Sequence, residues 1–108
     1  MKEKAELSLL LDYYGAFLTE KQAEILSMSA DEDMSLAEIA ETFGVSRQSV
    51  RASIVNASEK LENCEERLGL IERDRKLRVL LSGLDEAVLS ENIDGIKKAS
   101  ADIRAVLR

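Results

Sequence analysis

The sequence predicts an all-α protein, and three of its features support this expectation. The 108 residues contain no proline and only five glycines, so few positions interrupt a helix. Apolar side chains recur at intervals of three and four residues, which is the spacing of one face of a helix. Two segments begin with the Ser/Thr-x-x-Glu/Gln pattern of an N-terminal capping box. With 45% hydrophobic and 33% charged residues, the chain suits one ordinary soluble domain.

The N-terminal part of the chain is predicted to begin with two short helices. An apolar stripe over residues 7–14 ends at Gly15, where a first helix is expected to stop. Thr19 and Gln22 form a capping box, in which each side chain binds the free backbone N–H of the other residue. This box opens a second helix, which the acidic cluster at residues 31–33 interrupts.

A third and a fourth helix follow in close succession. Ser35 and Glu38 form another capping box, and the helix that they open is expected to end at Gly44. Ser46 is then the predicted N-cap of one long helix that stops near Gly69. The apolar stripe of this long helix consists of Val50, Ile54, Ala57, Leu61, Cys64 and Leu68.

The C-terminal part of the chain is predicted to form a helical hairpin. The apolar residues of its first helix are Leu70, Leu77, Leu80, Leu81, Leu84 and Val88. After a turn near residues 90–92, the second helix carries Ile93, Ile96, Ser100, Ile103 and Leu107. Because an isolated two-helix hairpin is marginally stable in water, it needs a surface to pack on, within the chain or on a second copy. We therefore expect a helix-turn-helix domain over residues 1–70 and a dimerisation hairpin over residues 71–108.

The segment SLAEIAETFGVSRQSVRASI, residues 35–54, matches a helix-turn-helix, since two helices are joined by a tight turn that contains Gly44. In such a motif the first turns of the second helix enter the major groove of DNA. Arg can pair with guanine, Gln with adenine and Ala with the thymine methyl group, while Ser hydroxyls reach phosphates or water. The candidate DNA-binding residues are therefore Ser46, Arg47, Gln48, Ser49, Arg51, Ala52 and Ser53.

Other interpretations of these residues stay open at this point. A pair of helices with a glycine corner also occurs as a purely structural unit. Arg47 and Arg51 also suit ordinary solvated positions, because the acidic remainder of the chain weakens a nonspecific attraction to phosphates. A second basic cluster suits either a nucleic-acid backbone or, with its interleaved acids, a solvated ion-paired face. Its members are Arg73, Arg75, Lys76 and Arg78.

Charge is distributed unevenly along the chain. The formal net charge is −6, from 15 basic and 21 acidic side chains. Residues 1–45 hold 3 basic and 10 acidic side chains, residues 46–78 hold 8 and 6, and residues 79–108 hold 4 and 5. A contact with a polyanion is therefore expected from Ser46 onward.

Composition argues against an enzyme, a metal protein and a membrane protein. Without histidine the chain has no imidazole base, and its one cysteine, Cys64, forms neither an internal disulfide nor a zinc cluster. We expect Cys64 to be buried in the apolar stripe. The adjacent acids at residues 31–33 lack the spaced ligands of a calcium loop and are interpreted as anions at a helix entry. No apolar run approaches the roughly 20 residues of a membrane span, and no cleavable signal is found at the start, so we expect a cytoplasmic protein without cofactors.

The runs LLDYYGAFLTEKQAEIL (residues 10–26) and DEDMSLAEIAETFGVSRQSVRASI (residues 31–54) resemble the YlxM family of small helix-turn-helix proteins. That family is typically encoded beside the genes of the signal recognition particle GTPase in bacteria, and its helix-turn-helix is similar to the fourth conserved region of sigma factors. The resemblance covers residues 7–70. It implies an all-α cytoplasmic protein of the winged-helix-like superfamily, with a bundle like sigma region 4 and a regulatory link to signal recognition particle components. By this analogy the base-reading positions are Arg47, Gln48, Arg51 and Ala52.

The sequence as a whole predicts a transcriptional regulator that binds double-stranded DNA through its helix-turn-helix and acts as a homodimer. The alternative is a protein–protein interaction module that docks on RNA polymerase or a signal recognition particle component. In that alternative the acidic residues 1–45 face a basic partner.

Overall fold

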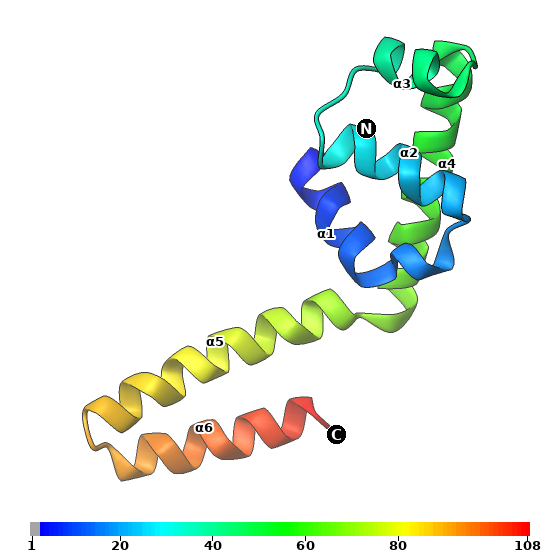
Figure 1. Cartoon of the computed structure of the whole chain (residues 1–108). Helices are drawn as coiled ribbons and strands as arrows, with labels where there is room; N and C mark the ends of the chain where they lie inside the picture. Colours follow the sequence, from blue (N-terminus) through cyan, green and yellow to red (C-terminus); the bar gives the residue numbers. More distant parts are fainter. Residues whose placement is uncertain (1–2) are drawn as a thin grey trace. The chain divides into compact units, whose positions relative to one another are not determined.

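The computed structural model describes residues 3–108, and every regular element in this range is helical (Figure 1). In chain order the elements are α1 (Lys4–Tyr14), the short 3₁₀ helix η1 (Gly15–Phe17), α2 (Glu20–Ala30), α3 (Leu36–Phe43), α4 (Arg47–Leu68), α5 (Leu70–Leu89) and α6 (Ile93–Val106). The predicted all-α fold class is confirmed. The described residues do not include Met1 and Lys2. These two residues belong to the predicted helix-turn-helix domain and to the N-terminal segment in which no cleavable signal is expected.

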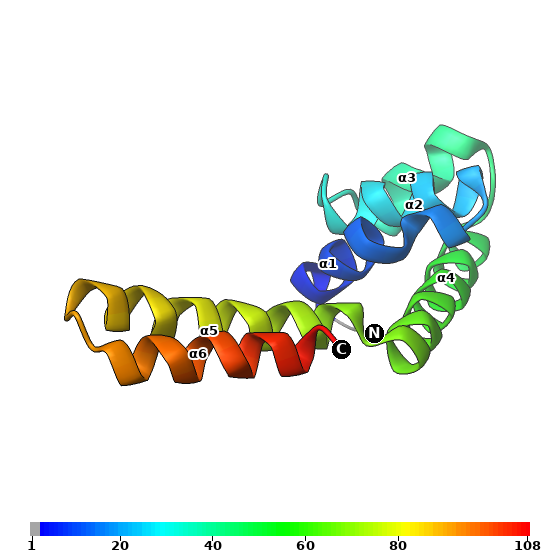
Figure 2. The ribbon, with the colours of Figure 1, turned by 90° about the horizontal axis from the view of Figure 1, so that it is seen from below.

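The helices form two compact units. One unit extends to Leu68 and the other covers Gly69–Arg108. In the first unit α1, α2 and α3 all pack against α4. In the second unit α5 and α6 run side by side in opposite directions, as Figure 2 shows from below.

The starts of α2 and α3 lie where their capping residues predict them. The Thr19 hydroxyl accepts a hydrogen bond from the Gln22 amide at 3.2 Å, and the Gln22 side chain accepts one from the Thr19 amide at 3.1 Å. Ser35 and Glu38 make the same reciprocal pair at 3.1 and 3.2 Å. Each box satisfies backbone donors that a helix leaves free in its first turn, and this fixes where α2 and α3 begin.

The core of the first unit is formed by apolar side chains from all four of its α-helices. Tyr14 is fully buried, and its hydroxyl donates a hydrogen bond to the Glu65 carboxylate at 2.5 Å, which joins α1 to α4. The buried apolar residues are Leu7, Leu10, Tyr14, Leu18, Ile25, Leu26, Ile39, Ala40, Val50, Ile54, Ala57 and Leu61. These residues hold α3 and the start of α4, which carry the candidate site, on a rigid support.

The apolar stripe of α4 is buried over a shorter length than the sequence predicts. Its residues from Val50 to Leu61 are buried, but Cys64 is only half-buried and Leu68 is 54% exposed. The physical reason is that the short helices of the first unit cover α4 as far as the level of Glu65, and the last turn extends beyond them. The expected burial of Cys64 is therefore only partly met.

The acidic cluster between α2 and α3 has specific partners on α1 and on the last turn of α2. Asp31 accepts hydrogen bonds from the hydroxyls of Ser8, at 2.5 Å, and Ser27, at 3.1 Å. Asp33 pairs with Lys4, and this neighbouring ammonium lowers the pKa of the Asp33 carboxyl. The interpretation of these acids as helix-entry anions was incomplete, because Asp31 and Asp33 also join the loop to α1. Contacts between residues so far apart in the sequence cannot be read from the acidic cluster itself.

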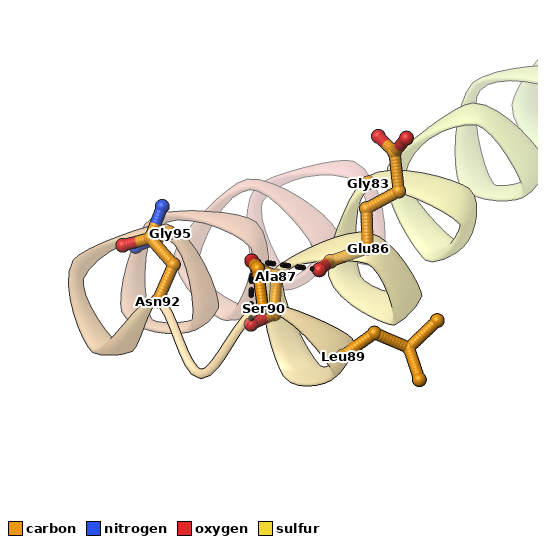
Figure 3. A pocket seen from close by; sticks show the side chains of 7 residues that line it. All are labelled: Gly83, Glu86, Ala87, Leu89, Ser90, Asn92 and Gly95. Atoms are coloured by element: carbon orange, nitrogen blue, oxygen red, sulfur yellow. Dashed lines mark hydrogen bonds between the residues drawn. The ribbon is translucent and has the colours of Figure 1, made fainter.

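The turn of the second unit brings two helices close together through small side chains. Asn92 caps α6 by accepting a hydrogen bond from the Gly95 amide at 3.0 Å. A Cβ atom added at Gly95 would lie 3.2 Å from the Cβ atom of Ala87, so the helices are in close contact there. Figure 3 shows this end of the hairpin, with Ser90 bonded back to Glu86 and the Leu89 side chain extending away from the turn.

Candidate nucleic-acid interface

The turn between α3 and α4 has the geometry that the sequence predicts. Gly44 has φ 64° and ψ 37°, a left-handed conformation that glycine adopts without the clash of a Cβ atom. The Val45 amide donates to the Ala40 carbonyl at 3.0 Å, which closes the end of α3. Ile39 on α3 and Ile54 on α4 are fully buried. The angle between the two helices is thus fixed by a tight corner and an apolar contact.

Ser46 opens α4 as its capping residue. Its side-chain oxygen accepts a hydrogen bond from the Ser49 amide at 3.0 Å, and its carbonyl accepts one from the Val50 amide at 3.1 Å. The hydroxyl proton of Ser46 remains available as a donor, because the cap uses only the oxygen as an acceptor. Ser46 therefore combines a structural role with the capacity to reach a phosphate.

The other candidate residues lie on the first two turns of α4. Val50 and Ile54, which alternate with them, are fully buried and point into the core. The exposed candidates are Ser46, Arg47, Gln48, Ser49, Arg51 and Ala52, whereas Ser53 is half-buried. The structure brings both arginines and the glutamine together on one accessible part of the helix, and Ser53 is the least accessible member of the set.

This surface has the chemical groups that read base edges. Two guanidinium groups and one amide offer bidentate hydrogen bonding, and Ala52 offers a small apolar contact. The free amides in the first turn of α4 add partial positive charge at the same place. Exposed acids are also close in sequence, since α3 carries Glu38 and Glu41, so the positive charge is local.

Sequence reasoning missed one cation beside the helix-turn-helix. The ammonium of Lys21 on α2 lies 5.9 Å from the centre of the Phe43 ring, at the end of α3. This is the geometry of a cation–π contact. No signal in the sequence links Lys21 with Phe43, because the contact depends on how α2 packs beside α3.

The second basic cluster belongs to the C-terminal unit. On α5, Arg75 pairs with Glu72 at 3.0 Å and Arg73 contacts Asp74 at 3.5 Å. These pairs support the ion-paired interpretation for two of its four members. They also set this cluster apart from the α4 surface, whose arginines form no ion pair that the described residues show.

Residues 3–108 contain neither a membrane-spanning helix nor a cluster of metal ligands. No helix among them is long and apolar enough to cross a membrane. No group of three or more acidic or cysteine side chains among them is placed to hold a metal ion.

Two helices joined by a left-handed glycine, with a capped second helix whose first turns are exposed, define a helix-turn-helix protein. Comparison with known sequences agrees. Residues 1–100 match the model of the UPF0122 family, described as "putative helix-turn-helix protein, YlxM / p13 like". The chain belongs to this family, which is one of helix-turn-helix proteins and not of enzymes.

Curated members of the family match nearly the whole chain. The UPF0122 protein of Symbiobacterium thermophilum is 42% identical over 106 residues, which cover 97% of this chain and 98% of the relative. The UPF0122 protein of Desulforamulus reducens is 36% identical over 111 residues, with 99% and 95% coverage. A relative from Clostridium perfringens is 39% identical over 100 residues, with 91% and 89% coverage. The resemblance to the YlxM family that the sequence motifs indicate is thereby confirmed.

Proposed function

We propose that this protein binds double-stranded DNA sequence-specifically and controls transcription, with the first turns of α4 in the major groove. The observation that carries the proposal is the exposed set Arg47, Gln48 and Arg51 on the second helix of a helix-turn-helix. The buried Val50 and Ile54 between them hold these side chains on a rigid element, as base reading requires. This role implies a cytoplasmic protein, and the YlxM resemblance suggests a link between its regulatory role and genes of the signal recognition particle pathway.

The test begins with selection of duplexes from a random DNA pool by the purified full chain. Fluorescence anisotropy of the best duplex across a salt series then measures affinity. Arg47→Ala and Arg51→Ala should each cost about 1 to 3 kcal/mol of specific binding. Arg67→Ala is the matched control, because Arg67 is an exposed arginine in the last turn of the same helix. Circular dichroism should show unchanged helix content in all three variants.

Either of two results would contradict the assignment to DNA. One is the absence of any enriched sequence in the selected pool. The other is equal loss of affinity in Arg67→Ala and in the variants at Arg47 and Arg51, since that pattern would indicate general charge attraction and not base reading.

A second candidate function rests on the charge of the first unit. Residues 1–68 hold 7 basic and 14 acidic side chains, a formal net charge of −7. An acidic surface of this kind complements a basic protein. The candidate partners are RNA polymerase and the components of the signal recognition particle. Titration of the labelled chain with each purified partner tests the idea. Reversal of exposed charges in Glu20→Lys and Glu24→Lys should then weaken binding, while Arg47→Ala should not.

A further inference from the structure

The C-terminal hairpin fully buries none of its large apolar side chains. Within Gly69–Arg108, all of which the structure describes, the buried residues are Ala87 and Ala99. Large apolar side chains of the same unit are exposed, namely Val79 (68%), Leu81 (47%), Val88 (53%), Leu89 (86%), Ile93 (61%) and Leu107 (60%). The larger apolar side chains near the contact between the two helices are only half-buried, so this contact removes only part of their area from water; they are Leu77, Leu80, Leu84, Ile96 and Ile103. The hairpin therefore leaves exposed apolar side chains that another partner can cover.

Most of these side chains lie on one face of the hairpin. Ala87 and Ala99, with Gly95, mark the sides on which α5 and α6 touch. With 3.6 residues per turn, the apolar stripe of each helix is rotated by about a quarter turn around the helix axis from that contact. The direction of this rotation is the same in both helices when each is viewed from its own N-terminus. Because the helices are antiparallel, equal rotations bring the two stripes to the same side. The stripes are Leu77, Leu81, Leu84 and Val88 on α5, and Ile96, Ser100, Ile103 and Leu107 on α6.

We propose that this face binds a second copy of the chain, so that two hairpins form a four-helix bundle in which each α5 packs against α6 of the partner. The two-fold axis runs parallel to the helices, between the two apolar faces. This inference goes beyond the proposed DNA binding and does not rest on it. In this arrangement both copies of Gly69 lie at the same end of the bundle.

The register within one hairpin shows why the two faces are complementary. Ala87 lies level with Gly95, and Val79 lines the same pocket as Asp102. A two-fold axis parallel to the helices keeps these levels in the partner. Apolar side chains then meet across the interface: Leu77 meets the partner's Ile103, Leu84 meets the partner's Ile96, and the exposed Val88 meets the partner's Ile93. Such layers are the usual core of a four-helix bundle.

Charge complementarity distinguishes this arrangement from the other symmetric one. Asp85 lies on the outer edge of the α5 stripe, and Lys97 lies on the outer edge of the α6 stripe. In the proposed bundle, Asp85 faces the partner's Lys97 at the same level, and this pair occurs twice. If α6 lay instead against the partner's α6, Lys97 would face the partner's Arg104. Opposite charges across the interface favour the first arrangement, and like charges disfavour the second.

The test measures the mass of the full chain in solution by light scattering after size exclusion and by sedimentation velocity. The wild type should be a dimer at micromolar concentration. Leu81→Asp, which places a charge in the centre of the face, should raise the dimer dissociation constant by at least about 100-fold. Val79→Asp is the matched control, because Val79 is an exposed apolar residue of the same helix on the opposite face, and the variant should remain a dimer. A monomeric wild type, or a dimeric Leu81→Asp, would overturn the proposal.

A charge exchange tests the arrangement without placing a charge in the apolar face. Asp85→Lys and Lys97→Asp should each raise the dissociation constant about tenfold, because each creates two like-charge pairs. The double variant should return to the wild-type value, since the opposite charges face each other again. Asp85 and Lys97 lie on opposite edges of one hairpin, so this rescue reports on contact between copies. A double variant that is weaker than both single variants would refute the packing of α5 against the partner's α6.

Discussion

The glycine between the two helices of the helix-turn-helix offers a test of the fold that separates backbone strain from packing. Gly44 has φ 64°, and a Cβ atom added there would meet nothing within 4 Å. Replacement by alanine therefore introduces no collision with the rest of the protein. Any loss of stability must come from the left-handed backbone itself.

The expected size of the effect follows from two opposing contributions. A residue with a Cβ atom in the left-handed conformation costs about 1 to 2 kcal/mol. Removal of the glycine also lowers the entropy of the unfolded chain, which returns about 0.4 to 1 kcal/mol. Gly44→Ala should thus lower the free energy of unfolding by about 1 kcal/mol. Gly44→Asn should lose less, because asparagine tolerates this conformation better than alanine.

Urea unfolding followed by circular dichroism measures these differences. In a separate thermal unfolding experiment, a loss of about 1 kcal/mol corresponds to a fall in Tm of about 4 to 8 °C for a unit of this size. Gly83→Ala is the control, because Gly83 lies inside α5, has no positive φ and also has open space around an added Cβ atom. It should raise stability by about 0.5 to 1 kcal/mol. An unchanged midpoint for Gly44→Ala, or a loss in Gly83→Ala as large as that in Gly44→Ala, would refute the reasoning from backbone conformation.

Three further predictions concern contacts within the first unit. Tyr14→Phe removes the donor to the Glu65 carboxylate and should lower the free energy of unfolding by about 1 kcal/mol. In a Glu65→Gln background the same change should lower the free energy of unfolding by less. An equal loss in both backgrounds would show that this hydrogen bond contributes nothing to stability. Ser35→Ala should cost about 1 kcal/mol in urea unfolding through loss of the capping box, whereas an unchanged midpoint would mean that α3 does not depend on its cap. Lys4 lowers the folded pKa of Asp33 below 3.8, so the stability from this pair is present above pH 3.8 and is lost as the pH falls through the lowered value. Asp33→Asn should remove that part of the acid dependence, and a variant with the wild-type pH profile below about pH 4 would contradict the assignment.

The starts of α2, α3 and α4 and the end of α3 could be predicted from the sequence because their signals are local. Thr19 and Ser35 each cap a helix through a residue three positions later, and Gly44 ends α3 through its own backbone conformation. Ser46 opens α4 by the same short-range chemistry. Interactions of this kind depend on a few neighbouring residues, so a single sequence contains the information needed to find them.

The features that escaped prediction depend on residues distant in sequence. Lys4 and Asp33 are 29 positions apart, and their pairing requires α1 to lie beside the loop before α3. The extent of burial along α4, and with it the exposure of Leu68, depends on how far the other helices reach. At the candidate site, the exposure of Arg47 and Arg51 follows from helical periodicity. Base reading by these two side chains stays a prediction, because it depends on DNA.

Charge links the proposed DNA binding with the proposed dimer. With a formal net charge of −7 over residues 1–68, a single copy gains little from nonspecific attraction to phosphates. A dimer offers two recognition helices, and once one has bound, the second binds as an intramolecular event at high effective concentration. Affinity then rises without additional positive charge. Leu81→Asp, which lies outside α4, should therefore weaken DNA binding far more than twofold, while Val79→Asp should not. If both variants bind the selected duplex as tightly as the wild type, one copy of α4 is sufficient for recognition, and pairing of the hairpins serves a purpose other than DNA affinity.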